Sequence, residues 1–428
     1  MDKNMLGAEN AAGEISAPIL EEDAPFSPNW SEIIAAFLLY IGAYVYMDGL
    51  ESWKLAAFVV LFIALTELLN RGRPLPWESW IWLGCMTVIT LSLLLDRAAV
   101  WEDFSLLFLH IFAVWWVLSR SGRLLEGKSG HLLPFDALNG FVLFPFRNFF
   151  LRIKTVWYTL TSPFRGKARS KPETVVWTIV ALIAAGLLFW LALRLLVDAD
   201  QGFAELISDW LLDLEFRLDG ETWLKFLFSL PVGAFLFGLL AGSARADGEK
   251  LRLRGQRINT GLNRLGKVPN LVWTLLTALF CLLYLLFFLV QAKYLFGAFT
   301  RSLPEGFIVS EYARQGFFEL CKVMAVNFVL LWLVTRLSAK PLGKNRAGTV
   351  LCVLLLAESM LFAVIAFSKL LLYISCFGFT PRRLQSSWLV CVLFFGCLCA
   401  GYSLLSGKKS FRAWMIFGAV SLTLLHLY

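Results

Sequence analysis

Long apolar runs separated by short polar segments dominate this chain of 428 residues. The apolar residues form continuous stretches instead of alternating with charge, and such stretches can cross a membrane as helices when they reach roughly 17–25 residues. The first four runs are short, near or below that lower limit. The eleven predicted spans cover about residues 30–47, 53–69, 80–95, 104–118, 175–196, 223–241, 271–290, 317–337, 350–373, 388–405 and 413–427. The predicted fold class is therefore an all-α, polytopic transmembrane helix bundle.

Two further segments have apolar side chains at helical spacing on one face only. Residues 146–160 place Arg147 and Lys154 opposite an aromatic face, and residues 203–214 combine an apolar face with acidic residues. This pattern is typical of amphipathic helices that lie in the membrane interface. A helix that docks a protein partner is the alternative for the first segment.

The same pattern divides the chain into four regions. Residues 1–29 carry Gly, Ala, Pro and acids without apolar periodicity, which predicts a disordered cytoplasmic tail. Residues 30–118 form a four-span N-terminal membrane segment, and residues 119–174 form a basic cytoplasmic and interfacial segment. Residues 175–428 form a seven-span membrane domain.

Composition supports membrane insertion and gives an orientation. The chain is 58% hydrophobic and contains 17 Trp, and its formal net charge is +8. The basic residues gather in alternate loops, above all between residues 120 and 171 and between 242 and 270, so the positive-inside rule places the N-terminus inside and the C-terminus outside. These loops are expected to meet anionic lipid headgroups on the cytoplasmic side. Nucleic acid is not an expected partner, because the basic residues sit in loops between apolar runs, where the orientation rule explains them. The run at 242–270 also lacks aromatic residues that could stack bases and has no phosphate-binding motif.

No cofactor, metal or catalytic site is predicted. The eight cysteines lie in or beside apolar runs, with no CxxC pair and no His at ligand spacing, so they are interpreted as buried thiols. No Ser/His/Asp arrangement converges within the spans. His110 lies alone within a span, and a hydrogen-bonded structural role is favoured over a ligand or proton site.

The spans at 317–337 and 350–373 contain charged side chains that a lipid-facing helix would not carry. Glu358 approaches the middle of the membrane and shares a helix face with Lys369, eleven residues later. Lys369 lies close enough to the outer surface to reach Glu319 on the neighbouring span. The candidate functional cluster consists of Glu311, Tyr312, Arg314, Glu319, Lys322, Glu358, Lys369, Tyr373 and Arg382.

Two motifs in the region 300–405 resemble a family of uncharacterised bacterial multi-pass membrane proteins that carry a domain of unknown function. They are Glu311-Tyr312-Ala313-Arg314-x-Gly316-Phe317-x-Glu319-Leu320 and Leu372-Tyr373-Ile374 followed by Gly378-Phe379-Thr380-x-Arg382. The family pattern has Arg at Lys369, Tyr at Phe377 and Leu at Phe379, and Glu358 is not part of it. The resemblance implies a location in the bacterial cytoplasmic membrane and supports the outer cluster, but it implies no reaction.

Three functional hypotheses follow. In the first, the protein transports or handles a ligand through an outer charged vestibule, with Glu358 titrating below it. In the second, it is a non-catalytic membrane partner of a sensor, transporter or envelope enzyme. In the third, it is an enzyme acting on a lipid-linked substrate. This hypothesis is the weakest, because the spans contain no convergent catalytic group.

Overall fold

The computed structural model of the chain describes residues 26–50, 52–95, 102–162, 220–266, 268–290, 317–339 and 345–427, together with residues 185, 188, 189 and 192. Within these residues the secondary structure is helical apart from one isolated bridge between Val268 and Ser338. The predicted all-α class is thus confirmed. The predicted span at 175–196 lies almost wholly outside the described residues, and the acidic helix at 203–214 lies entirely outside them.

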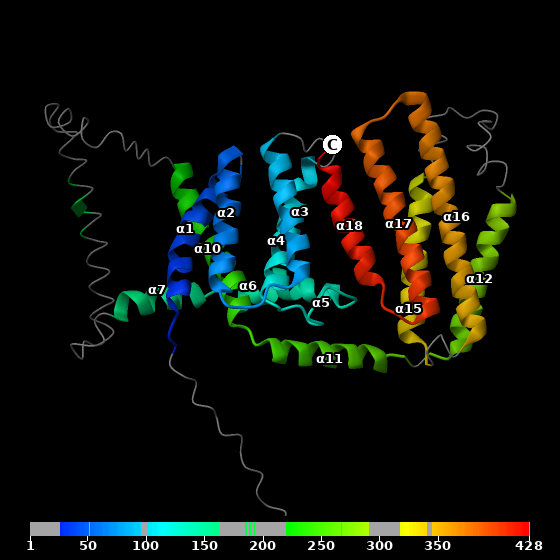
Figure 1. Cartoon of the computed structure of the whole chain (residues 1–428), viewed down its shortest axis with the longest axis horizontal. Helices are drawn as coiled ribbons and strands as arrows, with labels where there is room; N and C mark the ends of the chain where they lie inside the picture. Colours follow the sequence, from blue (N-terminus) through cyan, green and yellow to red (C-terminus); the bar gives the residue numbers. More distant parts are fainter. Residues whose placement is uncertain are drawn as a thin grey trace, which may run out of the picture.

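Most of the described helices stand side by side in one upright bundle (Figure 1). The upright helices are α1 (Trp30–Asp48), α2 (Ser52–Leu69), α3 (Trp77–Leu94), α4 (Glu102–Arg120), α10 (Gly220–Arg245), α12 (Asn270–Val290), α15 (Phe317–Leu337), α16 (Arg346–Phe377), α17 (Pro381–Ser406) and α18 (Phe411–Leu425). Each coincides with a predicted span. Seven of them, all but α2, α4 and α18, are long and apolar enough to cross a membrane, so the chain is a multi-pass integral membrane protein.

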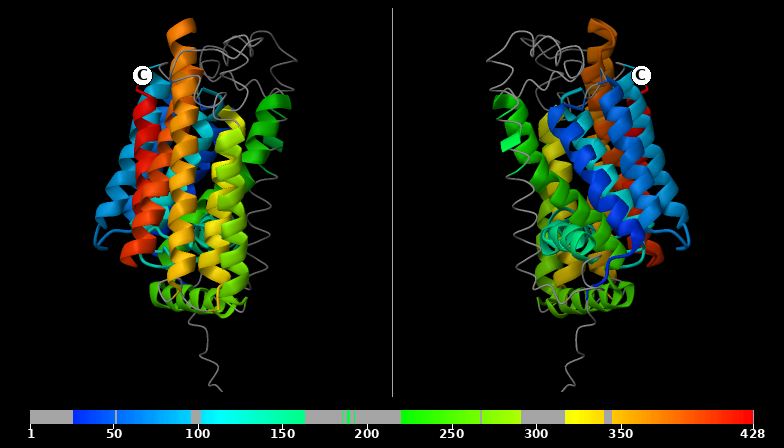
Figure 2. Two further views of the ribbon diagram at one scale, coloured as in Figure 1. Left: turned by 90° about the vertical axis from the view of Figure 1, so that its right-hand side faces the viewer. Right: turned by 90° about the vertical axis from the view of Figure 1, so that its left-hand side faces the viewer.

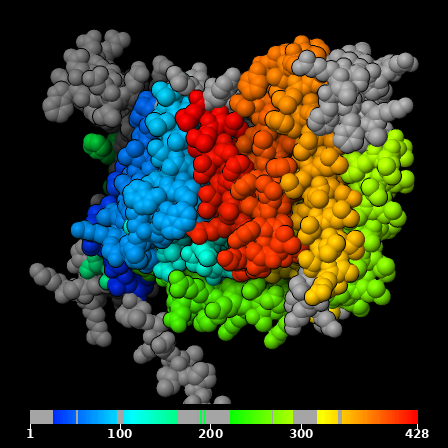
Figure 3. All heavy atoms as spheres, turned by 45° about the vertical axis from the view of Figure 1, so that its right-hand side comes forward, coloured from blue at the N-terminus to red at the C-terminus, as the bar shows by residue number. Residues whose placement is uncertain are grey.

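The upright helices form two hydrophobic clusters. The first is built from α1, α2, α3, α4 and α10, and the second from α12, α15, α16 and α17. Helix α18 packs against both α17 and α3, and its Leu422 belongs to the first cluster. Figure 3 shows α18, in red, between the blue helices of the first cluster and the orange helices of the second. The two clusters therefore meet at α18.

Short horizontal helices cover one end of the bundle, which we call the basic end (Figures 1 and 2). They are α5 (Leu133–Leu138), the π-helix η1 (Asn139–Leu143), α6 (Phe144–Arg147), α7 (Leu151–Thr161) and α11 (Gly248–Arg264). Helix α1 begins at the basic end and α18 ends at the opposite end. The predicted inside location of the basic end stays a prediction.

Arginine–glutamate pairs join helix ends at the basic end. Arg245 on α10 donates two hydrogen bonds, of 2.5 and 2.6 Å, to the carboxylate of Glu32 on α1. Arg120 on α4 donates bonds of 2.7 and 2.8 Å to Glu67 on α2. Such bidentate pairs fix geometry as well as charge. Part of the basic excess that the sequence shows at this end therefore holds the bundle together.

The first interfacial helix predicted from the sequence is present, but the prediction of one continuous helix over 146–160 is wrong. The chain turns at Asn148 between α6 and α7, and the Asn148 amide donates a 2.9 Å hydrogen bond to the Phe144 carbonyl. Asn148 also packs on Gly242 of α10, where an added Cβ would lie 2.3 Å from its Nδ2 atom. The break thus coincides with a close contact between segments far apart in sequence.

Helix α11 was expected only as a basic cytoplasmic segment. Asp247 caps its first turn by accepting hydrogen bonds from the backbone N–H groups of Glu249 and Lys250, at 2.9 and 3.3 Å. Gly255 faces the rest of the protein, and an added Cβ there would lie 2.6 Å from the Leu125 carbonyl oxygen. The helix thus lies flat across the basic end and connects α10 of the first cluster with α12 of the second (Figure 1).

Candidate functional site

A chain of polar side chains crosses the second cluster at mid-height. The Tyr284 hydroxyl on α12 donates a 2.7 Å hydrogen bond to Oδ1 of Asn327, the middle residue of α15. The Asn327 amide nitrogen donates a 2.8 Å bond to Oγ of Ser359 on α16. All three side chains are buried. Three helices are therefore joined by hydrogen bonds in a region that an apolar bundle would fill with aliphatic side chains.

Glu358 lies next to this chain in sequence and inside the same cluster. It sits about 18 Å along α16 from the start of the helix, at about 1.5 Å per residue, and is only 8% exposed. The Cys281 thiol of α12 lies near this carboxyl group and donates a 3.6 Å hydrogen bond to the Leu351 carbonyl oxygen of α16. Among the described residues, the Oε2 atom of Glu358 is buried and has no hydrogen-bond partner. The protein interior therefore surrounds this carboxyl group and leaves one oxygen available.

Lys369 lies three turns beyond Glu358 on α16 and is fully buried, with 0% exposure. It interacts electrostatically with Glu319, in the first turn of α15. Glu319 itself is exposed, so the pair has one buried and one solvent-accessible member. The structure thus brings together two residues of the predicted cluster that are fifty positions apart.

Other predicted cluster residues lie elsewhere. Lys322 and Arg382 are exposed, and Tyr373 is half-buried beneath the guanidinium of Arg383, which lies 4.2 Å from the ring centroid. Arg383 also donates hydrogen bonds to the carbonyl oxygens of Phe377 and Gly378 and so closes the end of α16. Glu311, Tyr312 and Arg314 lie outside the described residues. The described part of the cluster is therefore a buried core with a separate, exposed rim.

No pattern in the sequence indicates a functional role for Tyr284, Cys281 or Ser359. None of them carries a charge, and each is common in membrane helices for structural reasons. These side chains lie at the same level of the bundle because of the way α12, α15 and α16 pack. Hydropathy along the sequence does not predict that packing. The available signal was Glu358 itself, because a buried carboxyl group requires polar neighbours.

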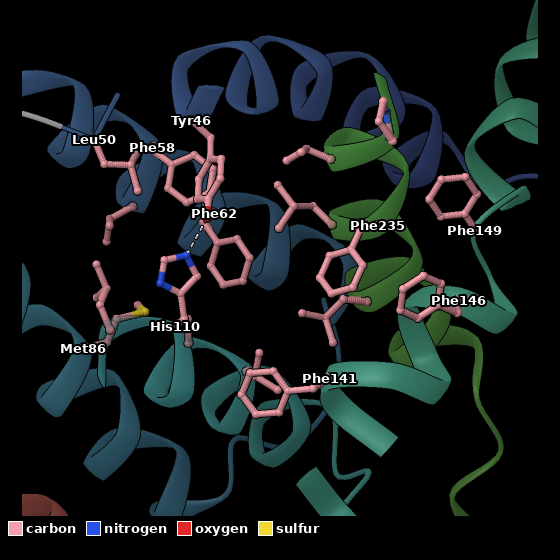
Figure 4. A pocket seen from close by; sticks show the side chains of 18 residues that line it. Tyr46, Leu50, Phe58, Phe62, Met86, His110, Phe141, Phe146, Phe149 and Phe235 are labelled. Atoms are coloured by element: carbon pink, nitrogen blue, oxygen red, sulfur yellow. Dashed lines mark hydrogen bonds between the residues drawn. The ribbon is translucent and has the colours of Figure 1, made fainter. Parts of the chain in front are cut away.

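A cavity of about 470 Å³ lies in the first cluster (Figure 4). It is lined almost entirely by apolar side chains, including Phe58, Phe62 and Phe235. His110 and Tyr46 form its polar pair, with 3.0 Å between the His110 Nε2 atom and the Tyr46 hydroxyl. The Nδ1 atom of His110 lies 2.5 Å from the Leu106 carbonyl oxygen. Both ring nitrogens are thus engaged, in agreement with the expected hydrogen-bonded role of His110.

The buried groups of the second cluster combine a carboxyl, an ammonium, an amide, two hydroxyls and a thiol, so the cluster contains both hydrogen-bond donors and acceptors. Among the described residues there is no group of three His, Cys, Asp or Glu side chains arranged to hold a metal ion.

Comparison with known proteins gives one result. The model of a family described as Domain of unknown function (DUF4153) matches residues 83–428. No curated protein matches the chain, and no solved structure matches it. The match extends well beyond the region 300–405 that carries the two motifs, and it confirms the expected type of family, a domain of unknown function. The chain therefore belongs to the DUF4153 family.

Proposed function

We propose that this protein transports or handles a small charged ligand through the polar interior of its second cluster, in the bacterial cytoplasmic membrane. One observation carries the proposal: Glu358 and Lys369 occupy one face of α16 and are both buried within protein. Ionisable side chains inside membrane segments are costly, and they mark ion and substrate pathways. The Tyr284–Asn327–Ser359 chain beside Glu358 supplies further polar contacts on that pathway.

The two ionisable groups have different roles in this proposal. Glu358 binds and releases a proton as the ligand passes, because its carboxyl group retains an oxygen without a partner among the described residues. Lys369 and Glu319 lie towards the end opposite α11, where they select the charge of the ligand that enters.

Replacement of Glu358 by Gln tests the proposal. The amide keeps the size and a hydrogen-bonding oxygen but cannot exchange a proton. Full-length protein in liposomes loaded with a pH-sensitive dye is given a proton gradient, and the proton flux is measured. Wild-type protein is expected to increase the flux above that of empty liposomes, and Glu358→Gln is expected to abolish the increase while the protein stays folded.

Glu249→Gln is the matched control, because Glu249 is exposed on α11 and far from the polar chain. It should retain the full flux. Equal fluxes from the wild-type and Glu358→Gln proteins, both above that of empty liposomes, would refute the role of Glu358 in proton transfer. The thermal unfolding temperature of each variant shows whether a loss of flux comes from misfolding.

A second function, that of a non-catalytic membrane partner, is supported by α11. Arg257 and Arg264 are exposed on this helix and have no ion pair within the described residues. A photo-crosslinker at position 257 should then capture one defined membrane protein in cells, whereas the same group at Leu286, exposed on α12, should not. If both positions give the same products, this candidate function is lost.

A further inference from the structure

A polar pocket of about 810 Å³ lies at the basic end, where the two clusters meet. It is lined by parts of the chain that are far apart in sequence: the start of α3, the segment 126–131, α11, and the ends of α15, α17 and α18 that face α11. None of its lining residues belongs to the candidate site described above. The pocket is therefore a separate feature of the fold.

The pocket has an excess of positive charge. Its acidic residue, Glu126, already lies 3.1 Å from both the His131 Nδ1 and the Lys409 Nζ atoms. Glu78, behind the wall, is 2.7 Å from Nη2 of Arg412. With these acids engaged, Lys128 and Arg336 have no ion pair within the described residues.

His131 adds little positive charge to the pocket at neutral pH. Burial is the largest effect on the His131 imidazole and lowers its pKa, while Glu126 and Asn259 favour the charged form. Lys409 and Arg336 lower its pKa further. The imidazole is then neutral at pH 7, and Lys128, Arg336, Lys409 and Arg412 supply the positive charge of the pocket.

Neutral hydrogen-bond donors complete the lining. The amides of Asn259 and Asn263 on α11 and the hydroxyl of Ser403 on α17 face the same space. Phe411, Arg412 and Ala413 bring the first turn of α18 to the pocket wall. Guanidinium, ammonium and amide donors around one space favour a phosphate group, whose oxygens accept several charge-assisted hydrogen bonds.

An apolar groove continues from the polar pocket. It has a volume of about 570 Å³, and its walls include Phe328, Trp332, Ala400 and Leu404 from α15 and α17. The two cavities share Thr335, Ser403, Ser410 and Phe411. A charged pocket that opens into an apolar groove at a membrane interface matches the shape of an amphiphile and not that of a free anion.

We propose that the polar pocket and its groove bind a phosphate-bearing anionic membrane lipid, with the headgroup phosphate between Arg336 and Lys409 and one acyl chain along α15 and α17. The lipid contacts residues from both clusters and stabilises their junction. This site is independent of the proposed transport function, because it uses none of the residues of the polar chain.

Lipid binding by the full-length protein tests the proposal. The detergent-purified protein is mixed with phosphatidylglycerol, with phosphatidylcholine of the same chains, or with glycerol 3-phosphate, and retained lipid is measured by native mass spectrometry beside the thermal unfolding temperature. Phosphatidylglycerol is expected to bind at least ten-fold more tightly than phosphatidylcholine. Replacing Arg336 and Lys409 together by Gln should remove this preference, because an amide cannot neutralise the phosphate.

Three variants make the result specific. Arg257→Gln removes an exposed arginine of α11 that does not line the pocket and should leave binding unchanged. Glu126→Gln removes the acid of the pocket and should tighten phosphatidylglycerol binding several-fold, so the test does not depend on a destabilised variant. Ala400→Trp fills the groove and should weaken lipid binding while leaving any glycerol 3-phosphate binding intact.

Equal binding of the two lipids would overturn the proposal, and so would an equal loss in Arg257→Gln. If glycerol 3-phosphate binds as tightly as the lipid and Ala400→Trp changes nothing, the pocket is a site for a free anion and the lipid assignment is wrong.

Discussion

The Tyr284 hydroxyl on α12 donates a 2.7 Å hydrogen bond to the side-chain oxygen of Asn327 on α15, at the centre of the second cluster. Removal of this donor by Tyr284→Phe leaves the Asn327 oxygen buried without its partner. We expect the free energy of unfolding to fall by about 1 kcal/mol. Hydrogen bonds between membrane helices contribute less than this on average, and the buried acceptor that is left unsatisfied adds to the loss.

The measurement is thermal unfolding of the purified protein, with Tyr402→Phe as the matched control, because Tyr402 is exposed. A loss of stability at Tyr402 as large as the loss at Tyr284 would show that the hydrogen bond contributes nothing specific.

The electrostatic interaction between Glu319 and Lys369 predicts partial rescue by charge exchange. Glu319→Lys places two positive charges together, and Lys369→Glu puts an uncompensated carboxylate in a fully buried position. The second change is expected to be the more damaging, because unpaired buried charges cost several kcal/mol.

The double variant should then be more stable than Lys369→Glu alone, by about 1 kcal/mol, because Glu319 is exposed and solvent weakens the interaction. Folded yield and unfolding temperature of the four proteins form a double-mutant cycle. A double variant no better than the worse single variant would show that the two residues do not interact.

The ionisation of the buried Asp136 carboxyl group on α5 should make the stability of the protein depend on pH. Burial raises the pKa of Asp136 to about 7. The 2.8 Å hydrogen bond that its Oδ1 atom accepts from the Leu125 N–H lowers the pKa and only partly offsets the effect of burial. A raised carboxyl pKa means that the folded protein holds the proton between pH 4 and pH 7 where the unfolded chain has lost it, so stability falls as the pH rises through this window.

Asp136→Asn removes the ionisation and keeps an oxygen for the Leu125 N–H. The variant should unfold at a higher temperature than the wild-type protein at pH 8, and the difference should shrink towards pH 4. Thermal unfolding from pH 4 to pH 8 measures this, and a difference that does not vary with pH would refute the ionisation argument.

Orientation in the membrane gives a fourth prediction. Arg257 on α11 and Arg382 at the start of α17 lie at opposite ends of the bundle, and both are exposed. Each is replaced by cysteine in a separate variant. In a background without Cys376 and Cys391, which are exposed, an impermeant thiol reagent should label position 382 in intact cells and position 257 only after the cytoplasm is opened. The reverse labelling would invert the predicted topology.

Hydropathy alone located the upright helices, because each is built from a long apolar run that can be recognised whatever its neighbours are. It did not find α11 as a helix lying across the bundle, since basic loops and basic amphipathic helices have similar composition. The break at Asn148 lies against Gly242, nearly a hundred residues later, and no local pattern contains that contact.

The candidate site was likewise predictable from the sequence only in part. Charge inside a predicted span identified Glu358 and Lys369, and the structure buries both. Their uncharged neighbours Tyr284 and Ser359 required the packing of three helices before they could be connected. Glu311, Tyr312 and Arg314 remain predictions that the described residues do not test.

Helix α11 also limits how the two clusters can move. It follows α10 after two residues and precedes α12 after a short segment, so it holds the two clusters at a fixed separation at the basic end. Relative motion then takes the form of a hinge whose axis runs near α11, with the largest displacement at the far end. A rocking movement would consequently open the junction of the clusters at α18 most at the far end and least beside α11. The polar chain and Glu358 lie inside the second cluster and would move with it as one unit.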